Sequence, residues 1–416
     1  MTQTARASAV PVPFDLNPVS PHNLFDPAPL YRELLRTAPV YWSDAVHGWF
    51  VTRYEDVAAC HRDPRLSANR AMLFEAQVQG EDKAALKDFL GLIRKMMFTM
   101  DGTEHMRVRR PSMPPFTPQA LESWYPVVRR TLEELVDRVL PRGRMDLAKE
   151  ISYAFPALVI AELFGIPTRD RERFQEWSAP IVEISAPGRT GGSQDLARRA
   201  NTALVEFHAY LMGLVAERRQ SPGGDVISQM LAAENEGRLT SEDVVANAIQ
   251  ILFAGHTTTT DLLSNGIHEL LMHPDQLQLL RDNPRLLKGA VEEVLRYSTS
   301  VPFNVRIAIE DIPLRGQLIP KGSLVFLGLA AANRDPDVFP EPDRFDITRD
   351  FTQQKHLSFG FGQHHCLGTV LARREMEIAF EVLLQRMPGL CIDEQQAPVR
   401  CHNLSFRGFT SLHIRW

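Results

Sequence analysis

Cysteine is scarce in this chain: four residues in 416, namely Cys60, Cys366, Cys391 and Cys401, far apart and without CxxC spacing. A scaffold of disulfides needs many cysteines in pairs, and a zinc ribbon needs closely spaced pairs, so both classes are excluded. We therefore expect a reduced, cytosolic protein, in which a lone thiol has to be explained by something other than cross-linking.

Long apolar runs and a strong excess of one charge are also missing. No window holds about 18 consecutive apolar residues, and the N-terminus has neither an apolar signal region nor a twin arginine, so we expect a soluble, cytoplasmic chain with no membrane anchor. Lys and Arg total 46 against 51 Asp and Glu, which gives 46 − 51 = −5. That balance argues against a nucleic-acid-binding protein.

Apolar periodicity predicts a mainly α protein with small β-sheets. Residues 1–20 are small, polar and punctuated by proline, so we expect a flexible N-terminal arm there and a single domain over 21–416, which we expect to be a monomer. Long helices are predicted at about 119–140, 151–165, 195–219, 241–272, 276–298 and 368–387. Short strands are predicted near residue 50, between 301 and 345, and at the end of the chain.

The stretch "ILFAGHTTTTDLL" lies in the middle of the longest predicted helix, which begins with a capping-box pattern at Thr240 and Asp243. Glycine and consecutive threonines weaken a helix and can bend or open it. One stripe of this helix carries an apolar surface, the gap at Gly255 and the single hydroxyl of Thr258. A close helix crossing and a ligand pocket both explain that stripe.

Two further segments suggest a buried ionic brace. In "GAVEEVLRY" the helical wheel places Glu293, and not Glu292, at the edge of the apolar half, three residues before Arg296. A half-buried carboxylate needs a fixed cation, and the proline-rich loop "FPEPDRFDITR" offers Arg344 as a second guanidinium.

The stretch "SFGFGQHHCLG" (358–368) surrounds Cys366 with glycines and histidines. Contiguous ligands and the lack of a second ligand pair argue against zinc. A buried structural cysteine, a nucleophile activated by a neighbouring histidine and an iron ligand all remain possible from the local chemistry. A helix that starts just after Cys366 favours a thiolate, and the glycines allow a planar ligand to approach, as in a haem site.

Taken together and in this order, these segments resemble the cytochrome P450 family of haem-thiolate monooxygenases, from about residue 27 to 416. The haem-ligand signature F-x-x-G-x-H-x-C-x-G is matched by Phe359, Gly362, His364, Cys366 and Gly368. The resemblance implies the P450 fold, with haem b between the long distal helix and the Cys-ligand loop.

Carried over residue by residue, the resemblance makes Cys366 the ligand of the haem iron and Glu293, Arg296 and Arg344 the structural triad. It implies a set of residues that contact the cofactor: His105, Arg109, Ala254, Arg306, Phe359, His364, Cys366 and Gly368. The cationic members suit the two haem carboxylates, which must be neutralised when they are buried.

The implied activity is insertion of one oxygen atom of O2 into a hydrophobic organic substrate, such as a fatty acid, terpenoid, steroid or polyketide, with protons passing through Thr258. The family usually has an acid where Thr257 stands here. Because this acid is missing, a peroxide-dependent peroxygenase is an alternative. A non-catalytic haem-binding sensor is a second alternative. No flavin or iron–sulfur segment is present, so a ferredoxin with its reductase is expected to supply electrons, landing on Arg107, Arg110, Arg373 and Arg374.

Substrate contacts are expected from the segments that vary within the family. The candidates are Phe74, Phe98, Ala254, Val301, Phe303 and Phe406. Their apolar character indicates a hydrophobic substrate of moderate to large size.

Overall fold

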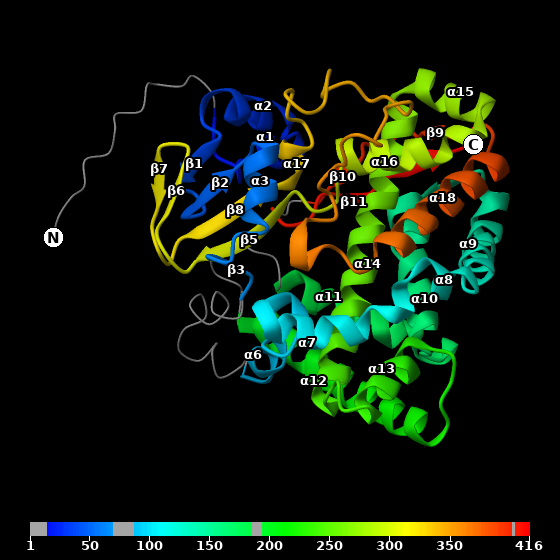
Figure 1. Ribbon diagram of the computed structural model, residues 1–416. Helices are drawn as coiled ribbons and strands as arrows, with labels where there is room; N and C mark the ends of the chain where they lie inside the picture. The colour runs from blue at the N-terminus through cyan, green and yellow to red at the C-terminus, as the bar shows by residue number, and fades with distance from the viewer. Residues whose placement is uncertain (1–14, 70–86, 185–193, 402–403) are drawn as a thin grey trace.

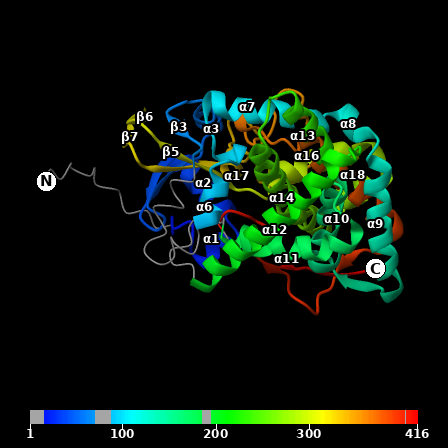
Figure 2. The same ribbon diagram turned by 90° about the horizontal axis from the view of Figure 1, so that it is seen from below.

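The structure, a computed structural model, describes residues 15–69, 87–184, 194–401 and 404–416. Figure 1 shows two parts side by side: a smaller part with the largest β-sheet, and a larger part made of helices, with α14 running through the middle. Seen at a right angle in Figure 2, the sheet again lies to one side of the stacked helices. Among the described residues, no helix is both long and apolar enough to cross a lipid bilayer.

Helices make up most of the described chain, as the sequence predicts. They are α1 (Pro21–Phe25), α2 (Ala28–Thr37), α3 (Tyr54–Cys60), α6 (Lys87–Ile93), α7 (Gly102–Ser112), α8 (Pro118–Glu122), α9 (Tyr125–Val139), α10 (Ala154–Leu163), α11 (Arg171–Ile184), α12 (Gln194–Gln220), α13 (Val226–Asn235), α14 (Ser241–Met272), α15 (Pro274–Asp282), α16 (Leu287–Tyr297), α17 (Leu329–Ala332) and α18 (Thr369–Arg386). The last residues of the predicted arm, 15–20, form a turn, because the Asn23 side chain donates to the carbonyls of Asp15 and Asn17.

The central helix α14 begins and ends where its sequence signals stand. The Thr240 hydroxyl accepts from the Asp243 N–H at 3.1 Å while the Asp243 carboxylate accepts from the Thr240 N–H at 2.9 Å, which completes the capping box. Pro274 follows the last turn. As predicted, one helix covers 241–272, and it continues through the glycine and the threonine run.

Two predicted helices are wrong as single elements. The segment 119–140 divides into α8 and α9 at residues 123–124, because Pro126 has no N–H to donate to the carbonyl four residues earlier. The segment 276–298 divides into α15 and α16, because Pro284 lacks the N–H that a continuous helix needs and starts a short 3₁₀ turn at 284–286. On α16, two neighbouring acids bind residues much later in the chain. Glu293 accepts from the Asp346 N–H, and Glu292 accepts from Arg373.

Within the described residues, the strands form one five-stranded sheet and three small ones. The large sheet has the order β1 (Val40–Ser43), β2 (Gly48–Val51), β8 (Leu324–Gly328), β5 (Phe303–Ala308), β3 (Leu66–Ser67). The small sheets pair β6 (Ile312–Leu314) with β7 (Gln317–Ile319), β10 (Val399–Arg400) with β11 (Phe409–Ser411), and β12 (His413–Arg415) with β4 (Arg144–Asp146) and β9 (Cys391–Ile392). Strands β2 and β8 are parallel, with Phe50 opposite Phe326, so the two halves of the sequence meet in this sheet.

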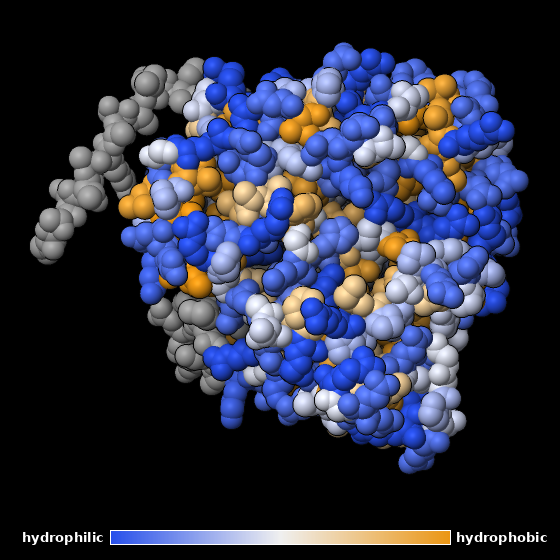
Figure 3. All heavy atoms as spheres, viewed as in Figure 1, coloured by the Kyte–Doolittle hydropathy of each residue, from blue (hydrophilic) through white to orange (hydrophobic). Residues whose placement is uncertain are grey.

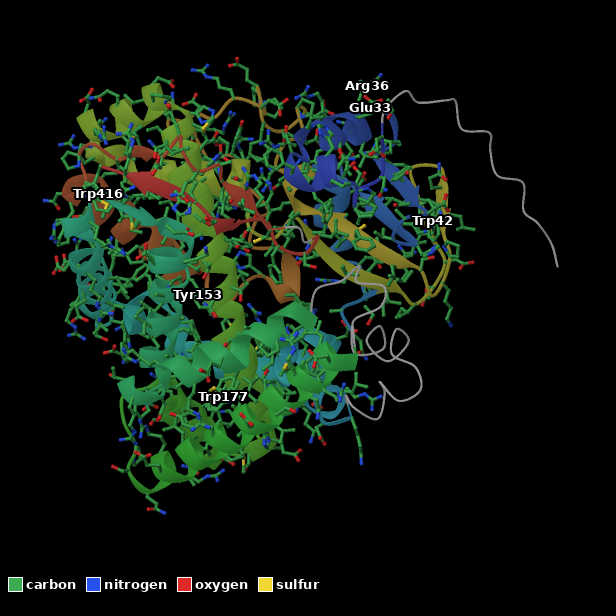
Figure 4. The ribbon with its side chains drawn as sticks, turned by 180° about the vertical axis from the view of Figure 1, so that it is seen from behind. Glu33, Arg36, Trp42, Tyr153, Trp177 and Trp416 are labelled. Atoms are coloured by element: carbon green, nitrogen blue, oxygen red, sulfur yellow. The ribbon has the colours of Figure 1, made fainter. Side chains whose placement is uncertain are left out.

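Each part has its own apolar core. The largest cluster joins α9, α10, α12, α14, α16 and α18, and two smaller clusters fill the two faces of the large sheet. In Figure 4 the labelled Tyr153 and Trp177 lie among the helices, while Trp42 lies in the sheet part. The outer surface in Figure 3 is mainly hydrophilic, with apolar side chains in small separated groups.

Candidate active site

A large cavity lies where α14, strand β5 and the loop before α18 meet. Its empty volume is about 1360 Å³, including a mouth open to solvent. Residues from both parts of the chain line it, including Thr258 on α14, Arg306 on β5 and Cys366 in the loop. The segments singled out from the sequence therefore surround one space.

The stripe predicted on α14 faces this cavity. Its lining residues are Ile251, Ala254, Gly255, Thr258 and Leu262. Gly255 also packs against α10, since a Cβ there would lie 3.2 Å from Ile160 Cγ1. The pocket and the close helix crossing are thus both real, on adjacent sides of one glycine. Thr258 Oγ1 donates to the Ala254 carbonyl at 2.8 Å, whereas Thr257 is not among the described residues that line the cavity.

The loop before α18 is folded around Cys366. The Cys366 N–H donates to the Phe359 carbonyl at 2.8 Å, and Thr369 Oγ1 donates to the Cys366 carbonyl at 2.7 Å. Gly360 and Gly362 have φ of 69° and 71°, a left-handed conformation that favours glycine, and a Cβ on Gly362 would lie 3.0 Å from the His61 carbonyl oxygen. The glycines thus shape the turn that presents the thiol to the cavity.

Opposing effects act on the Cys366 thiol. Burial raises its pKa, while the Gly368 N–H, the Thr369 hydroxyl and the positive charges of Arg109 and Arg373 lower it. The N-terminus of the 18-residue helix α18 follows directly and favours an anion at this point. Hydrogen-bond donors and cations are therefore arranged around the sulfur.

Two arginines and a histidine reach the same cavity, and none of the three forms an ion pair with a described acid. Arg306 is buried, forms no ion pair within the described chain and donates only to the Val305 carbonyl, and burial lowers its pKa to about 10. Neither ring nitrogen of the buried His105 has a hydrogen-bond partner among described residues, and burial lowers its pKa to about 4. The His105 ring stacks on His364 at 4.0 Å between centroids. Arg109 donates to the His365 carbonyl.

Unpartnered donors of this kind fit a ligand with buried carboxylates. A haem presents two propionates, and the thiol of Cys366 lies in the same cavity as His105, Arg109 and Arg306. The volume, the donor set and the thiol thus agree with the cofactor that the sequence implies.

The predicted ionic brace is present, but one of its members is wrong. Glu293 is fully buried and accepts a fork of two bonds from Arg296, both at 2.8 Å. The second cation is Arg349, whose Nε lies 3.3 Å from Glu293 Oε2. Arg344 is 57% exposed and pairs with Glu341; it contributes only its carbonyl oxygen, which accepts from Arg296 at 3.1 Å.

The predicted substrate contacts divide between the cavity and other places. Phe98, Ala254 and Val301 line the cavity. Phe303 instead packs on Phe50, with ring centroids 5.1 Å apart, on the opposite face of its strand. Together with Phe406 it lines a separate small hollow near α1 and α2. Phe74 lies outside the described residues.

An acidic residue on the cavity wall was missed. Glu375 on α18 lines the cavity, and burial raises the pKa of its carboxyl well above the usual value. The signal was present, because Glu375 lies four residues after Leu371 and three before Ile378 on the buried face of the helix. The rule that identified Glu293, an acid on the apolar face of a helix, therefore also identifies Glu375.

Three of the four arginines expected to receive a redox partner already have partners. Arg107 binds Asp243 at 2.7 Å, Arg373 binds Glu292 at 2.5 Å, and Arg374 binds Glu377 at 2.7 Å. Arg110 is exposed on α7.

Comparison with known proteins agrees with this geometry. The family model described as cytochrome P450 matches residues 67–406. The chain is 37% identical over 369 residues to the "Biotin biosynthesis cytochrome P450" of Bacillus subtilis (strain 168), covering 88% of this chain and 90% of that one. It is 35% identical to the "Cytochrome P450 monooxygenase PikC" of Streptomyces venezuelae, covering 100% and 97%.

A solved structure, that of epothilone D-bound cytochrome P450epoK, superimposes with a TM-score of 0.87 at 30% identity, covering 97% of this chain and 99% of that one. With the match of the family model over most of the sequence, the fold and the relatives lead to one conclusion. The chain belongs to the cytochrome P450 family, and it is a P450 monooxygenase whose cofactor is haem b.

Proposed function

We propose that Cys366 is the ligand of the haem iron, that Thr258 serves the opposite face, and that the enzyme inserts one oxygen atom of O2 into a hydrophobic organic substrate. When bound, the haem supplies the redox-active iron at which dioxygen is activated. The protein's own contribution is to hold the cofactor, orient the substrate and control protons.

One observation carries this proposal: donors that form no ion pair among the described residues face the same cavity as the thiol of Cys366. His105, Arg109 and Arg306 can each donate to a carboxylate at the wall of that cavity. Burying a carboxylate without such donors costs roughly several kcal/mol. Because these donors offset that cost, the site favours a ligand that carries carboxylates. His364, stacked on His105, belongs to the same wall.

Cys366 is held at the cavity by a turn that can present its sulfur to a metal. Burial raises the pKa of the thiol above its usual value, and the Gly368 N–H and the charges of Arg109 and Arg373 act in the opposite direction. Phe359 and the two left-handed glycines fix the turn that carries it. The loop can therefore hold an anionic sulfur toward the cavity with little rearrangement.

On the other side of the cavity, Thr258 donates its own proton to the Ala254 carbonyl, so its oxygen lone pairs are available to accept a hydrogen bond. A hydroxyl held in this way can position a water or a substrate hydroxyl. Thr257 offers no carboxylate beside it. Glu375 on α18 also lines the cavity, and because burial raises the pKa of its carboxyl well above the usual value, it is a candidate proton store.

The substrate is proposed to be hydrophobic and of moderate to large size, such as a fatty acid, terpenoid, steroid or polyketide. Phe98, Ile251, Leu262 and Val301 give the cavity an apolar wall above its polar end. Solved relatives in complex with epothilone D and with testosterone support a ligand of this size. A screen of such ligands for spin-state shifts of the haem spectrum tests this class.

Electrons are proposed to come from a separate ferredoxin and its reductase. Arg110 is exposed on α7, which carries His105 and Arg109 to the cavity, so an acidic partner docked there would lie close to the site. Arg110→Glu should slow electron transfer more at low salt than at high salt, because a surface charge mainly changes the association rate. An undiminished rate in Arg110→Glu and in Arg374→Glu would remove this docking site.

The decisive experiment is the carbon monoxide difference spectrum of the reduced protein. A Soret band shifted far to the red marks an intact thiolate ligand, and Cys366→Ala should abolish it, whereas Cys391→Ala should leave it unchanged. If Cys366→Ala keeps the band, the assignment of the ligand is wrong.

A second function is favoured by the threonine at position 257. Without an acid next to Thr258, a peroxide-dependent peroxygenase is the alternative, since peroxide brings its own protons and electrons. Turnover with hydrogen peroxide, and none with ferredoxin, reductase and O2, would select it. A haem sensor would give neither kind of turnover.

A further inference from the structure

Two neighbouring acids on α16 point to different partners. Glu293 belongs to the brace described above, and Glu292, which the helical wheel left on the outer side, binds residues near the Cys366 loop instead. Its partners are Arg373 on α18 and His356 in the segment that leads into the loop.

The carboxylate of Glu292 receives donors from two elements. Arg373 Nε donates to Oε1 at 2.5 Å and Nη2 donates to Oε2 at 2.9 Å, a fork that fixes the plane of the guanidinium. His356 Nδ1 accepts from the Ser358 N–H at 3.2 Å, so its proton lies on Nε2, 3.2 Å from Glu292 Oε2. Most surface ion pairs lack such a defined orientation.

The fixed guanidinium covers the ring of Phe359. Its central carbon lies 4.7 Å from the ring centroid, within the range of a cation–π contact. The His356 ring approaches the same ring, with centroids 5.8 Å apart. Phe359 in turn accepts the Cys366 N–H at its carbonyl, at 2.8 Å. A continuous series of contacts thus runs from Glu292 through Arg373 and Phe359 to Cys366.

We propose that Glu292 is a positioning residue for Cys366: it holds the Arg373 guanidinium flat on Phe359 and thereby fixes the loop that presents the sulfur. This inference rests on the proposed function, in which the Cys366 thiolate is the iron ligand. Without the fork, the guanidinium has free rotamers and leaves the ring for part of the time, and the loop loses one of its restraints.

The test compares the haem-loaded wild type with Glu292→Gln, Arg373→Gln, Arg373→Lys and the double variant Glu292→Gln/Arg373→Gln. The matched control is Glu377→Gln, which breaks an arginine–carboxylate pair on the same helix, since Arg374 covers Tyr125 at 5.0 Å and not Phe359. The measurement is the rate at which the red-shifted Soret band of the reduced carbon monoxide form is lost in moderate urea. Far-UV circular dichroism follows unfolding in parallel.

Glu292→Gln and Arg373→Gln should each lose the thiolate band at least about fivefold faster than the wild type, before the helices unfold. The double variant should be no faster than the faster single one, because both changes remove one shared interaction. Arg373→Lys should behave like Arg373→Gln, because lysine keeps the charge but not the planar fork. Glu377→Gln should stay within about twofold of the wild type.

If both single variants lose the Soret band at the same rate as the control, the inference is overturned. A wild-type rate in Arg373→Lys would also overturn it, because the effect would then depend on charge alone. Loss of the band only together with the helical signal would reduce Glu292 to a general stabilising residue and also overturn it. A wild type that lacks the band would refute the proposed function and this inference with it. A normal wild type with unchanged variants refutes the inference alone.

Discussion

Replacing Arg349 should destabilise the protein far more than replacing Arg344, although the two lie in the same loop. The Arg349 side chain is 12% exposed, its Nε lies 3.3 Å from the fully buried Glu293 carboxylate, and Nη1 donates to the Pro340 carbonyl at 2.8 Å. Arg344 is 57% exposed and pairs with the exposed Glu341 at 3.3 Å and, at 3.8 Å, with the half-buried Asp346.

The expected loss in the free energy of unfolding depends on which hydrogen bonds to Glu293 each substitution leaves in place. Removing one partner of a buried pair costs about 3–5 kcal/mol, but in Arg349→Gln the Glu293 carboxylate keeps the fork from Arg296 and the Asp346 N–H at 2.9 Å. We therefore expect a loss of about 2–4 kcal/mol, since hydrogen bonds to charged groups contribute about 1.5–3 kcal/mol each. Arg344→Gln should cost at most about 1 kcal/mol.

Urea unfolding of the haem-loaded protein, followed by far-UV circular dichroism, measures both. At a slope of about 3 kcal/mol per molar, a loss of about 3 kcal/mol moves the midpoint by about 1 M, and the Arg344 variant should shift by a third of that or less. Arg349→Lys should fall between, because it keeps the charge but loses the guanidinium's bonds to the carbonyls of Pro340 and Glu341. Equal shifts for Arg344→Gln and Arg349→Gln would show that the brace does not depend on Arg349.

Three further predictions rest on the structure. Gly289→Ala on α16 should lower the free energy of unfolding by about 1–3 kcal/mol, because its Cβ would lie 2.6 Å from the Ile347 carbonyl oxygen. Gly213→Ala, whose Cβ would have nothing within 4 Å, should raise the free energy of unfolding by about 0.4–1 kcal/mol. Shifts of the urea midpoint in the same direction for both variants would contradict this. Burial raises the pKa of Asp261 to about 8 from 3.8, so the folded state binds a proton that the unfolded state releases, and stability should fall as pH rises from about 4 to 8 by up to about 1.4 kcal/mol per pH unit. Asp261→Asn should remove that part of the slope in urea titrations at several pH values, and identical slopes in both proteins would refute the assignment. Thr257→Glu should lower the fraction of reductant lost as hydrogen peroxide, measured by a peroxide assay during turnover, while Thr258→Ala should raise it; unchanged peroxide release in Thr257→Glu would end the argument for a missing proton relay.

Local signals in the sequence predicted the elements around the site well. The capping box at Thr240 predicted where α14 begins, and Pro274 predicted where it ends. The apolar stripe predicted which face of α14 lines the cavity. Pro284 was equally readable as a break, and merging α15 with α16 overlooked it. These features depend on neighbours in the chain, which a single sequence shows directly.

The choice between Arg344 and Arg349 depends on how a loop turns. Glu341 adopts φ of 47°, a left-handed conformation, and in the loop that follows the Arg344 side chain is 57% exposed while the Arg349 side chain is 12% exposed. The sequence shows two arginines five residues apart in an irregular segment, and no periodicity decides which of them faces inward. The identity of the second cation was therefore beyond the reach of pattern reasoning.

Strand parity, by contrast, could have corrected the substrate pocket. Arg306 was expected to reach the cofactor, and side chains two apart on a strand share a face, so Asn304 belongs with Arg306 and Phe303 does not. The structure agrees, since Asn304 and Arg306 line the cavity while Phe303 packs on Phe50. Assigning both Phe303 and Arg306 to one site contradicted the period of the strand.

The pairing of β4 with β12 has a consequence for synthesis of the chain. Strand β4 joins residues 144–146 to residues 413–415, and Leu147 N–H donates to the Leu412 carbonyl at 2.8 Å. At about 5–20 residues per second, the 413 − 146 = 267 residues between them take about 13–53 s to translate. During that interval α9 and α10 can form on the ribosome, but the strand between them has an open edge. Its length of three residues limits mispairing with other nascent chains, so a short β4 suits a partner that is made so late.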